Sequence, residues 1–323
     1  MIYALAILYH FLCGNIRNLE TENRSGYLVT ADIKRVWKIQ MDLVTKLLEV
    51  CKKYNLYIWA DSGTLIGTIR HKGYIPWDDD IDMAMMREDY DKLLSVAETE
   101  FQHPYFFQTA YSEKAPYCHG HAQLRMDGTT AILHNNVPMD IHLGIFIDIF
   151  VLDSVPKDKD AMMKMARLIR KAKKPLEFRM DNRISLTSRM LCRWMPMSIF
   201  KERYKRMEGL AKTHANNESN YVAPILLCQE EAFLQRNMLN KEWYKETMWM
   251  PFEDILLPVP VGYDKILTLQ YGDYMTPAKE PSMHGGFLVL DAERDYKYYL
   301  PNLRKHKREE KFNKFLQKIH LRK

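Results

Sequence analysis

The chain has 323 residues, of which 47% are hydrophobic and 12% aromatic, enough for a large buried core and too many for an intrinsically disordered protein. Its 47 Lys and Arg residues exceed its 41 Asp and Glu residues only slightly. The five cysteines are scattered without a Cys-x-x-Cys pair, which argues against a zinc ribbon or a disulfide framework. We therefore expect reduced thiols and a cytoplasmic location.

The N-terminal residues 1–31 are expected to form a separate segment that begins with an apolar run over residues 2–13. This run lacks a positively charged leading region and is too short to span a bilayer. It is consistent with a packed helix, with a membrane-touching helix, or with a start codon assigned too early. No other stretch has the length and apolarity of a transmembrane segment.

An amphipathic helix is predicted over residues 32–54, because apolar side chains recur there at spacings of three and four. Thr30 or Asp32 can cap its start, and Asn55 can end it. A short apolar strand is expected next, over residues 56–60.

The small residues Ser62, Gly63 and Thr64 predict a turn that leads into a helix over residues 65–70. The start of a helix presents backbone N–H groups and the positive end of the helix dipole, which together bind phosphate. Gly63 allows close approach, and both hydroxyl groups can donate. The triplet is therefore a candidate phosphate-binding turn, although such triplets are commonly turns without a ligand.

Three basic side chains are further candidates for phosphate contact: Arg70, Lys72 and Arg125. Arg70 is equally suited to an ion pair with a carboxylate. A loop is expected over residues 73–77, where Pro76 excludes a helix.

Two carboxylates, Asp80 and Asp82, begin a predicted strand over residues 80–85. Side chains two apart share one face of a strand, so both carboxylates should point the same way while Ile81 and Met83 enter the core. Carboxylates on one face repel each other unless a cation lies between them. The pattern therefore indicates a hard divalent metal, Mg²⁺ or Mn²⁺.

A second buried strand with one carboxylate is predicted over residues 144–152, which are nearly all apolar around Asp148. A buried strand seldom carries an unpartnered carboxylate, so Asp148 requires a metal, an arginine or a donor network. A helix is expected from Arg87 onward, and strands over residues 106–109 and 121–126.

Residues 157–212 differ from the rest, with 17 Lys and Arg residues against 6 Asp and Glu, a net charge of +11. Most of the segment has a helical pattern. Basic charge beside a Met-rich and aromatic face suits a membrane surface or an anionic polymer. A solvated helical insertion whose apolar face packs on the catalytic domain is at least as good an explanation.

Toward the C-terminus the sequence predicts an extended segment over residues 257–260, then a short helix from Gly262 that stops at Gly272. The tail from residue 304 to residue 323 is basic and weakly amphipathic.

Three carboxylates on two neighbouring strands suit metal-assisted phosphoryl or nucleotidyl transfer, in which metals neutralise charge on phosphate oxygens. Each piece also has an ordinary explanation: Asp-x-Asp pairs occur by chance, and Asp78 and Asp79 need only extend a polar loop. His119 and His121 are interpreted as loop histidines or substrate contacts, since no third metal ligand is evident.

The motif Asp61-Ser62-Gly63-Thr64-Leu65-Ile66-Gly67, with the residues 70–73 and 75–82 that follow, closely resembles the signature of the LicD family. That family comprises phosphorylcholine transferases and has the fukutin-type transferases as distant relatives. Residues 123–126, 142–153 and 258–274 match further family segments in order, so the likeness covers residues 33–277 except for the basic middle segment. One departure is Val151, where many relatives carry proline.

The resemblance implies an α+β fold, with a nucleotidyltransferase-like mixed β-sheet core flanked by helices and an added basic helical segment. The catalytic domain would span residues 32–300, with an insertion at 157–212 and a basic tail at 301–323. Such a protein would transfer a phospho-alcohol from CDP-choline or a similar CDP-alcohol onto a hydroxyl of a cell-surface glycan precursor. CMP would be released, and the product would belong to lipopolysaccharide or teichoic acid.

By motif, the resemblance assigns Asp80 and Asp82 to a metal pair, and matches Asp148 to a third carboxylate that acts as metal ligand or as base. It assigns Ser62, Gly63 and Thr64 to the phosphate-holding turn. The quaternary ammonium of choline would require an aromatic or acidic cage. The candidate aromatic residues are Trp59, Tyr74, Trp77 and Tyr117.

Two other functions are compatible with these residues. A glycosyltransferase would use Asp80 and Asp82 to hold the metal of a sugar nucleotide. A non-catalytic protein would bind nucleic acid or another anionic surface through the basic segment, but the intact carboxylate set argues against it. The basic segment and the N-terminal run also predict peripheral contact with the inner membrane face, where lipid-linked glycans are built.

Overall fold

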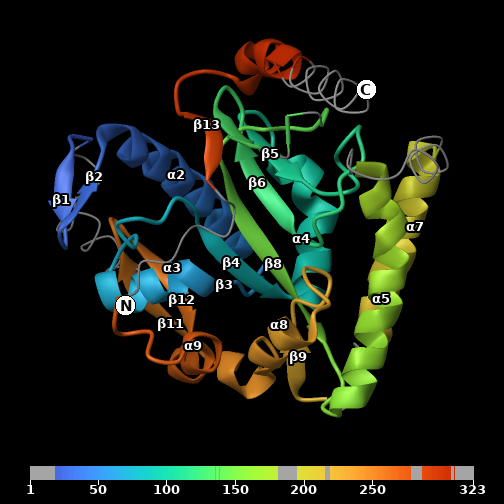
Figure 1. Cartoon of the computed structure of the whole chain (residues 1–323). Helices are drawn as coiled ribbons and strands as arrows, with labels where there is room; N and C mark the ends of the chain where they lie inside the picture. The colour runs from blue at the N-terminus through green and yellow to red at the C-terminus, as the bar shows by residue number, and fades with distance from the viewer. Residues whose placement is uncertain are drawn as a thin grey trace, which may run out of the picture.

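A mixed β-sheet of seven strands lies at the centre of the structure, which is a computed structural model (Figure 1). The structure describes residues 19–306 and residue 309, except residues 135, 138, 181–194, 215–218 and 278–285. Strand β8 (Phe146–Ser154) runs parallel to β4 (Asp82–Met86) and antiparallel to β6 (Ala122–Met126) and β9 (Tyr221–Ala223). The remaining strands pair antiparallel at the edges: β3 (Trp59–Ala60) with β4, β5 (Tyr105–Gln108) with β6, and β10 (Leu239–Asn240) with β9. The prediction of an α+β fold is confirmed.

Two helices pack against this sheet, α2 (Ala31–Lys53) and α4 (Arg87–Glu100). The predicted amphipathic helix is α2, whose apolar side chains, Trp37 and Leu43 among them, enter the main core. Thr30 is its N-cap, since the Thr30 hydroxyl accepts a hydrogen bond from the Ile33 backbone N–H. Asn55 follows the last turn with a positive φ of 52°, a conformation that Asn tolerates better than most residues. Both predicted ends of the helix are confirmed.

The elements around the acidic motif begin at positions other than those predicted. The first turn of helix α3 (Ser62–Ile66) already contains the Ser-Gly-Thr triplet, and a π-helical turn, η1 (Gly67–His71), continues it. Strand β4 begins at Asp82, so Asp80 precedes the strand. The strand expected over residues 56–60 is limited to β3, and the one expected over residues 144–152 is shifted to β8.

The basic segment forms a pair of helices along one edge of the molecule, α5 (Lys159–Met180) and α7 (Met197–Ala211) (Figure 1). Their apolar faces build a second core, which includes Met162, Ile169, Phe200 and Met207. The prediction of helices is confirmed for the described part. Residues 181–194, which include part of the second predicted helix, lie outside the described residues.

Smaller units surround the central sheet. These are the hairpin β1 (Glu22–Arg24) and β2 (Tyr27–Val29), the pair β7 (Thr130–Leu133) and β13 (Phe287–Asp291), the pair β11 (Thr247–Phe252) and β12 (Ile255–Pro260), the helices α8 (Glu231–Arg236) and α9 (Tyr263–Tyr271), and the 3₁₀ turns η2 (Lys212–His214) and η3 (Lys241–Tyr244). Gly272 ends α9 with a φ of 70°, as predicted.

No helix in the described part of the chain combines the length and the apolarity that a membrane span requires. The apolar run at residues 2–13 lies outside the described residues, and only residues 304–306 and 309 of the predicted basic tail lie within them. The division of the chain into segments stays a prediction.

Candidate active site

Three carboxylates meet where strands β4 and β8 begin. Asp82 and Asp148 are direct partners across the parallel strand pair, and Asp80 lies two residues before Asp82. One carboxylate oxygen from each of Asp80, Asp82 and Asp148 lies within 4.8 Å of the others. The structure thus brings together the three residues that the sequence singled out, with Asp148 buried and the other two partly exposed.

The electrostatics of this cluster disfavour three simultaneous charges. Burial, followed by the neighbouring Asp82 carboxylate, raises the pKa of Asp80 well above its usual range. Burial, followed by the Asp148 carboxylate, does the same to the pKa of Asp82. A divalent cation would remove this repulsion, and a donor set made only of carboxylate oxygens matches the preference of Mg²⁺ and Mn²⁺.

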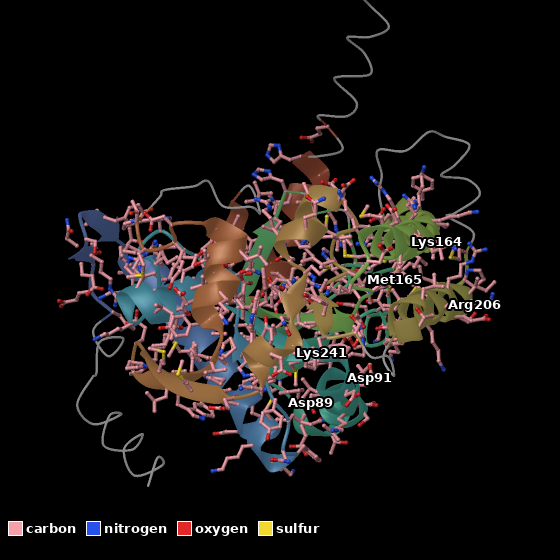
Figure 2. All side chains as sticks on the ribbon, turned by 90° about the horizontal axis from the view of Figure 1, so that it is seen from below. Asp89, Asp91, Lys164, Met165, Arg206 and Lys241 are labelled. Carbon is pink, nitrogen blue, oxygen red and sulfur yellow. The ribbon has the colours of Figure 1, made fainter. Side chains whose placement is uncertain are left out.

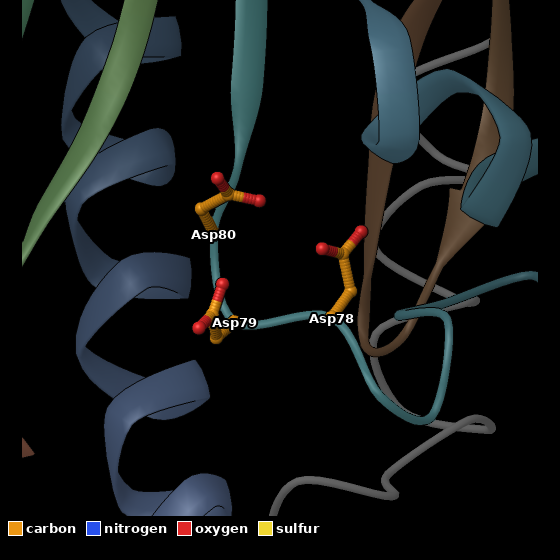
Figure 3. Close-up of side chains that lie close together, drawn as sticks. All are labelled: Asp78, Asp79 and Asp80. Carbon is orange, nitrogen blue, oxygen red and sulfur yellow. The ribbon is translucent and has the colours of Figure 1, made fainter. Parts of the chain in front are cut away.

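The two aspartates that precede this group extend it. Oxygens of Asp78, Asp79 and Asp80 also lie within 4.8 Å of one another (Figure 3). Helix α2 holds the backbone of this turn, because Trp37 Nε1 donates to the Asp78 carbonyl at 3.1 Å and Gln40 Nε2 donates to the Asp79 carbonyl at 2.8 Å. These contacts explain why residues 78–80 do not join the sheet.

Helix α3 is fixed directly to the acidic strand. The Thr64 hydroxyl accepts a hydrogen bond from the Asp82 backbone N–H at 2.8 Å, and the Asp61 N–H donates to the Asp82 carbonyl at 3.0 Å. A Cβ on Gly63 would come within 2.7 Å of Asp78 Oδ2, so glycine allows that carboxylate to approach the first turn of the helix, toward which Asp78 points (Figure 3). The predicted phosphate turn therefore lies beside the acidic cluster.

Asp61, at the N-cap position of α3, is a site residue that the sequence did not single out. Burial raises its pKa to about 6, while the hydrogen bond from the Ser62 hydroxyl, 3.2 Å long, acts in the opposite direction. Its charge adds to the field that raises the pKa of Asp82.

The three basic candidates have different surroundings. Lys72 is exposed and follows the π-helical turn with a φ of 56°. Arg70 donates from Nη1 to the Tyr274 carbonyl, so it links η1 to the segment after α9. Arg125 is buried, and its guanidinium donates to Gln108, Gln123 and the Gly144 carbonyl. Arg125 therefore has an internal, structural role in place of the predicted contact with phosphate.

Comparison with known proteins shows which proteins the chain is similar to. The family model described as the LicD/FKTN/FKRP nucleotidyltransferase domain matches residues 55–122. A protein of Haemophilus influenzae named lipopolysaccharide cholinephosphotransferase LicD is 29% identical over 235 residues, which cover 70% of this chain and 84% of that protein. The chain is thus similar to LicD over most of its length. An uncharacterized protein of Rickettsia typhi is 33% identical over 123 residues, 35% of each chain.

These findings confirm the predicted resemblance to LicD and the prediction of a LicD-like phosphotransferase enzyme. The family match contains α3, Asp80 and Asp82, and it ends before Asp148. In this LicD relative the third carboxylate is therefore recognised by its position opposite Asp82 in the sheet.

One further contact of this LicD relative was missed from the sequence. His121 Nε2 lies 2.9 Å from Asp148 Oδ1, so His121 is not an uninvolved loop residue. Burial lowers the pKa of the neighbouring His119 to about 3, which keeps that imidazole neutral. The sequence did contain an indication of such a contact. His121, Gln123 and Arg125 lie two apart, so the predicted strand over residues 121–126 would carry three polar side chains on one face.

The aromatic residues proposed for a choline cage do not converge. Trp59, Tyr74 and Tyr117 are buried in separate contacts: Trp59 against Tyr244, Tyr74 stacked on Trp37, and Tyr117 hydrogen-bonded to Gln123. Trp77 is partly exposed and packs edge-to-face with Tyr27 of the β1–β2 hairpin. The four candidate residues therefore do not form one cage, and of the four only Trp77 keeps a partly exposed ring, just before the acidic turn.

Proposed function

We propose that this LicD relative transfers phosphocholine, or another phospho-alcohol, from a CDP-linked donor onto a hydroxyl group of a cell-surface glycan precursor. The observation that carries the proposal is the group of Asp80, Asp82 and Asp148 oxygens within 4.8 Å of one another. The similar Haemophilus protein named lipopolysaccharide cholinephosphotransferase supports choline as the alcohol and lipopolysaccharide as the product. The mixed sheet that carries these residues supports a nucleotidyltransferase-like core.

In the proposed site, Asp80, Asp82 and Asp148 hold Mg²⁺ or Mn²⁺. When bound, the cation supplies positive charge to the phosphate oxygens of the donor. The N–H groups and the positive dipole end of α3 lie beside the same carboxylates and would hold the donor's phosphates. Lys72, which is exposed just after η1, remains a candidate cationic contact for the donor.

The reaction needs little covalent chemistry from the protein. The oxygen of the acceptor hydroxyl attacks the phosphorus of the phosphocholine group, and the bond from that phosphorus to the CMP oxygen breaks. The hydroxyl loses its proton to a carboxylate of the cluster or to water. What the chain provides is the position of donor and acceptor and the stabilisation of charge on the transferring group.

Release of CMP tests this proposal. Purified protein with Mn²⁺, CDP-choline and a lipopolysaccharide acceptor should release CMP and label the glycan, and EDTA should stop both. Asp80→Asn and Asp82→Asn should remove the activity and keep the circular dichroism spectrum. An active Asp82→Asn variant would contradict the metal assignment. Stabilisation against heat by UDP-sugars, without any by CDP-alcohols, would favour a glycosyltransferase.

We also propose that the helices α5 and α7 dock the enzyme on an anionic membrane surface, where a lipid-linked acceptor would be available. Figure 2 shows Lys164 and Arg206 at the outer end of the molecule that these helices form. The exposed basic side chains of the pair, in the part of it that the structure describes, are Lys159, Lys164, Arg167, Arg170, Lys171, Lys174, Arg203, Lys205 and Arg206. Leu168 and Ile199 are exposed among them and would enter the lipid headgroup region.

Vesicle flotation tests the membrane contact. The protein should float with vesicles that contain phosphatidylglycerol and remain behind with phosphatidylcholine vesicles, and added salt should weaken the binding. Lys171→Glu with Lys174→Glu should reduce flotation, whereas Lys38→Glu on α2 should not. Equal flotation of all three proteins would refute the assignment of this surface.

A further inference from the structure

Asp148 is held by two donors from the neighbouring strand. Gln123 Nε2 donates to Asp148 Oδ1 at 2.7 Å, and His121 Nε2 lies 2.9 Å from the same oxygen. Gln123 is the register partner of Asp148 in the antiparallel pair of β6 and β8, and His121 immediately precedes β6. Two donors on one oxygen fix the rotation of the carboxylate, and an oxygen of that carboxylate reaches the Asp80 and Asp82 oxygens.

The orientation of the Gln123 amide follows from its other contacts. Gln123 Oε1 accepts hydrogen bonds from the Tyr117 hydroxyl at 3.0 Å and from Arg125 Nη2. Both partners are donors, so the carbonyl oxygen must face them and the NH₂ group must face Asp148. Arg125 is held in turn by the Gly144 carbonyl at 2.6 Å. The buried network therefore ends in a single defined donor toward Asp148.

The backbone beside His121 is held by contacts with residues 226 and 227. Gly120, with a φ of 83°, lies so close to the Leu226 carbonyl that a Cβ would come within 2.2 Å of it. Lys173 of α5 is buried and donates from Nζ to the Leu226 and Leu227 carbonyls, each at 3.0 Å. These contacts hold the segment that precedes β6 against the second core.

The orientation of the His121 ring toward Asp148 leaves its other nitrogen unpaired within the ranges that the structure describes. Its Nδ1 is buried and has no hydrogen-bond partner among the described residues. A ring that makes one hydrogen bond and leaves its other nitrogen unpaired is positioned by the bond it makes. His121 completes no three-ligand group with Asp80 and Asp82 in the described part of the chain, so it acts on the site through Asp148.

We infer that His121 and Gln123 are positioning residues that set the orientation of Asp148 for metal binding. The inference rests on the metal centre proposed above, and in it both residues act through Asp148. Donors behind a ligating carboxylate orient the ligand and tune its affinity, and their loss typically costs about 10–100-fold in metal affinity.

Mn²⁺ binding, followed by electron paramagnetic resonance of the free ion without donor or acceptor, tests this inference. Gln123→Glu keeps the oxygen that Tyr117 and Arg125 require but replaces the donor with a second carboxylate oxygen. His121→Phe keeps an aromatic ring beside Phe150 and removes the donor. Each variant should bind Mn²⁺ roughly 10–100-fold more weakly than the natural chain.

Matched substitutions separate this effect from a general loss of structure. His103 also pairs with an aspartate, Asp127, but its side chain is 83% exposed, and Gln235 is an exposed glutamine that bonds Glu231. His103→Gln and Gln235→Glu should bind Mn²⁺ as the natural chain does. Thermal unfolding of the metal-free proteins identifies any variant that fails to fold. If one of His121→Phe and Gln123→Glu fails to fold, the Mn²⁺ affinity of the other still tests the inference.

Mn²⁺ affinity within threefold of the natural chain in both folded variants would overturn the inference. The measurement is independent of the transfer reaction. A natural chain that binds Mn²⁺ but releases no CMP would refute the proposed reaction and leave the positioning role supported, whereas a natural chain that binds no Mn²⁺ would overturn the positioning role itself.

Discussion

At the scale of single residues, the acidic cluster makes stability depend on pH when no metal is bound. The pKa values of Asp61, Asp80 and Asp82 are all raised, mainly by burial. At pH values between the usual pKa near 4 and the raised pKa of the folded state, the folded chain holds more protons than the unfolded chain. The stability that these groups contribute is therefore greatest at low pH and falls as the pH rises.

We predict that EDTA-treated protein loses stability from pH 5 to pH 8 and that Mn²⁺ restores it. Asp82→Asn should reduce this loss, because it removes one of the repelling carboxylates, and each kcal/mol of relief raises the unfolding midpoint by roughly 2–4 °C. Differential scanning calorimetry with and without EDTA measures both effects. A pH dependence that is identical in the variant would show that the cluster is not the cause.

His142 predicts a change in the opposite direction. Burial is the main reason that its pKa is lowered to about 4. Its Nδ1 accepts a hydrogen bond from the Gly144 N–H at 3.1 Å, and its Nε2 lies 2.7 Å from Asp127 Oδ1, so the neutral ring already uses both nitrogens. A lowered pKa in the folded state means that stability is lost as the pH falls below about 6.5.

We expect His142 to make the free energy of unfolding lower at pH 5 than at pH 8 by on the order of 2 kcal/mol. Urea unfolding of the Mn²⁺-saturated proteins, in which the cation removes the opposite contribution of the acidic cluster, should show a smaller difference between the two pH values in His142→Gln than in the natural chain. His103→Gln, which changes the exposed partner of the same aspartate, should retain the full difference. If His142→Gln retains it as well, the acid sensitivity arises elsewhere.

At the scale of elements, alanine substitutions at two glycines in helical turns should change stability in opposite directions. A Cβ on Gly67, which begins η1, would lie 2.5 Å from the Gly73 carbonyl oxygen, whereas Gly209 on α7 has nothing within 4 Å of that position. Gly67→Ala should therefore cost about 1–3 kcal/mol through overpacking. Gly209→Ala should stabilise by about 0.5–1 kcal/mol, because alanine is the better helix former. Chemical denaturation measures both, and a tolerated Gly67→Ala would mean that the turn at Gly73 can move.

The sequence predicted the elements whose signals are local. Helix α2 has a long apolar period and a capping threonine, and its bounds were nearly right. The start of β4 was predicted two residues too early, and side chains of α2 bind the carbonyls of Asp78 and Asp79 just before it, a contact between segments about forty residues apart that the local sequence does not reveal. The role of His121 was missed for the same reason, since its partner lies on a different strand.

At the scale of the whole molecule, Arg87 joins the central sheet to the helical pair. Arg87 begins α4 and donates from Nε and Nη2 to both oxygens of Asp153 on β8, at 2.7 and 2.9 Å. Its Nη1 lies 3.6 Å from Glu208 on α7. All three side chains are buried, so the two hydrophobic cores are connected by one ionic group.

Removal of Arg87 should destabilise the chain strongly. Arg87→Met leaves two buried carboxylates without their cation, and breaking a buried pair in this way costs about 3–5 kcal/mol. Arg87→Lys should recover only part of this loss, because an ammonium group cannot bridge both Asp153 oxygens as a planar guanidinium does. Guanidinium chloride unfolding measures the change, and a loss below about 1 kcal/mol in Arg87→Met would contradict the bridging role.

The register of β4 and β8 has a consequence for how such a protein tolerates insertions and deletions. Asp82 and Asp148 face each other across one rung of a parallel pair, whose register is fixed along the whole of β4. A single residue inserted within either strand would turn the downstream side chains to the other face. The long connection between the strands carries this restriction only at β6, where Gln123 is in register with Asp148, so its loops can lengthen or shorten while the two carboxylates keep their spacing.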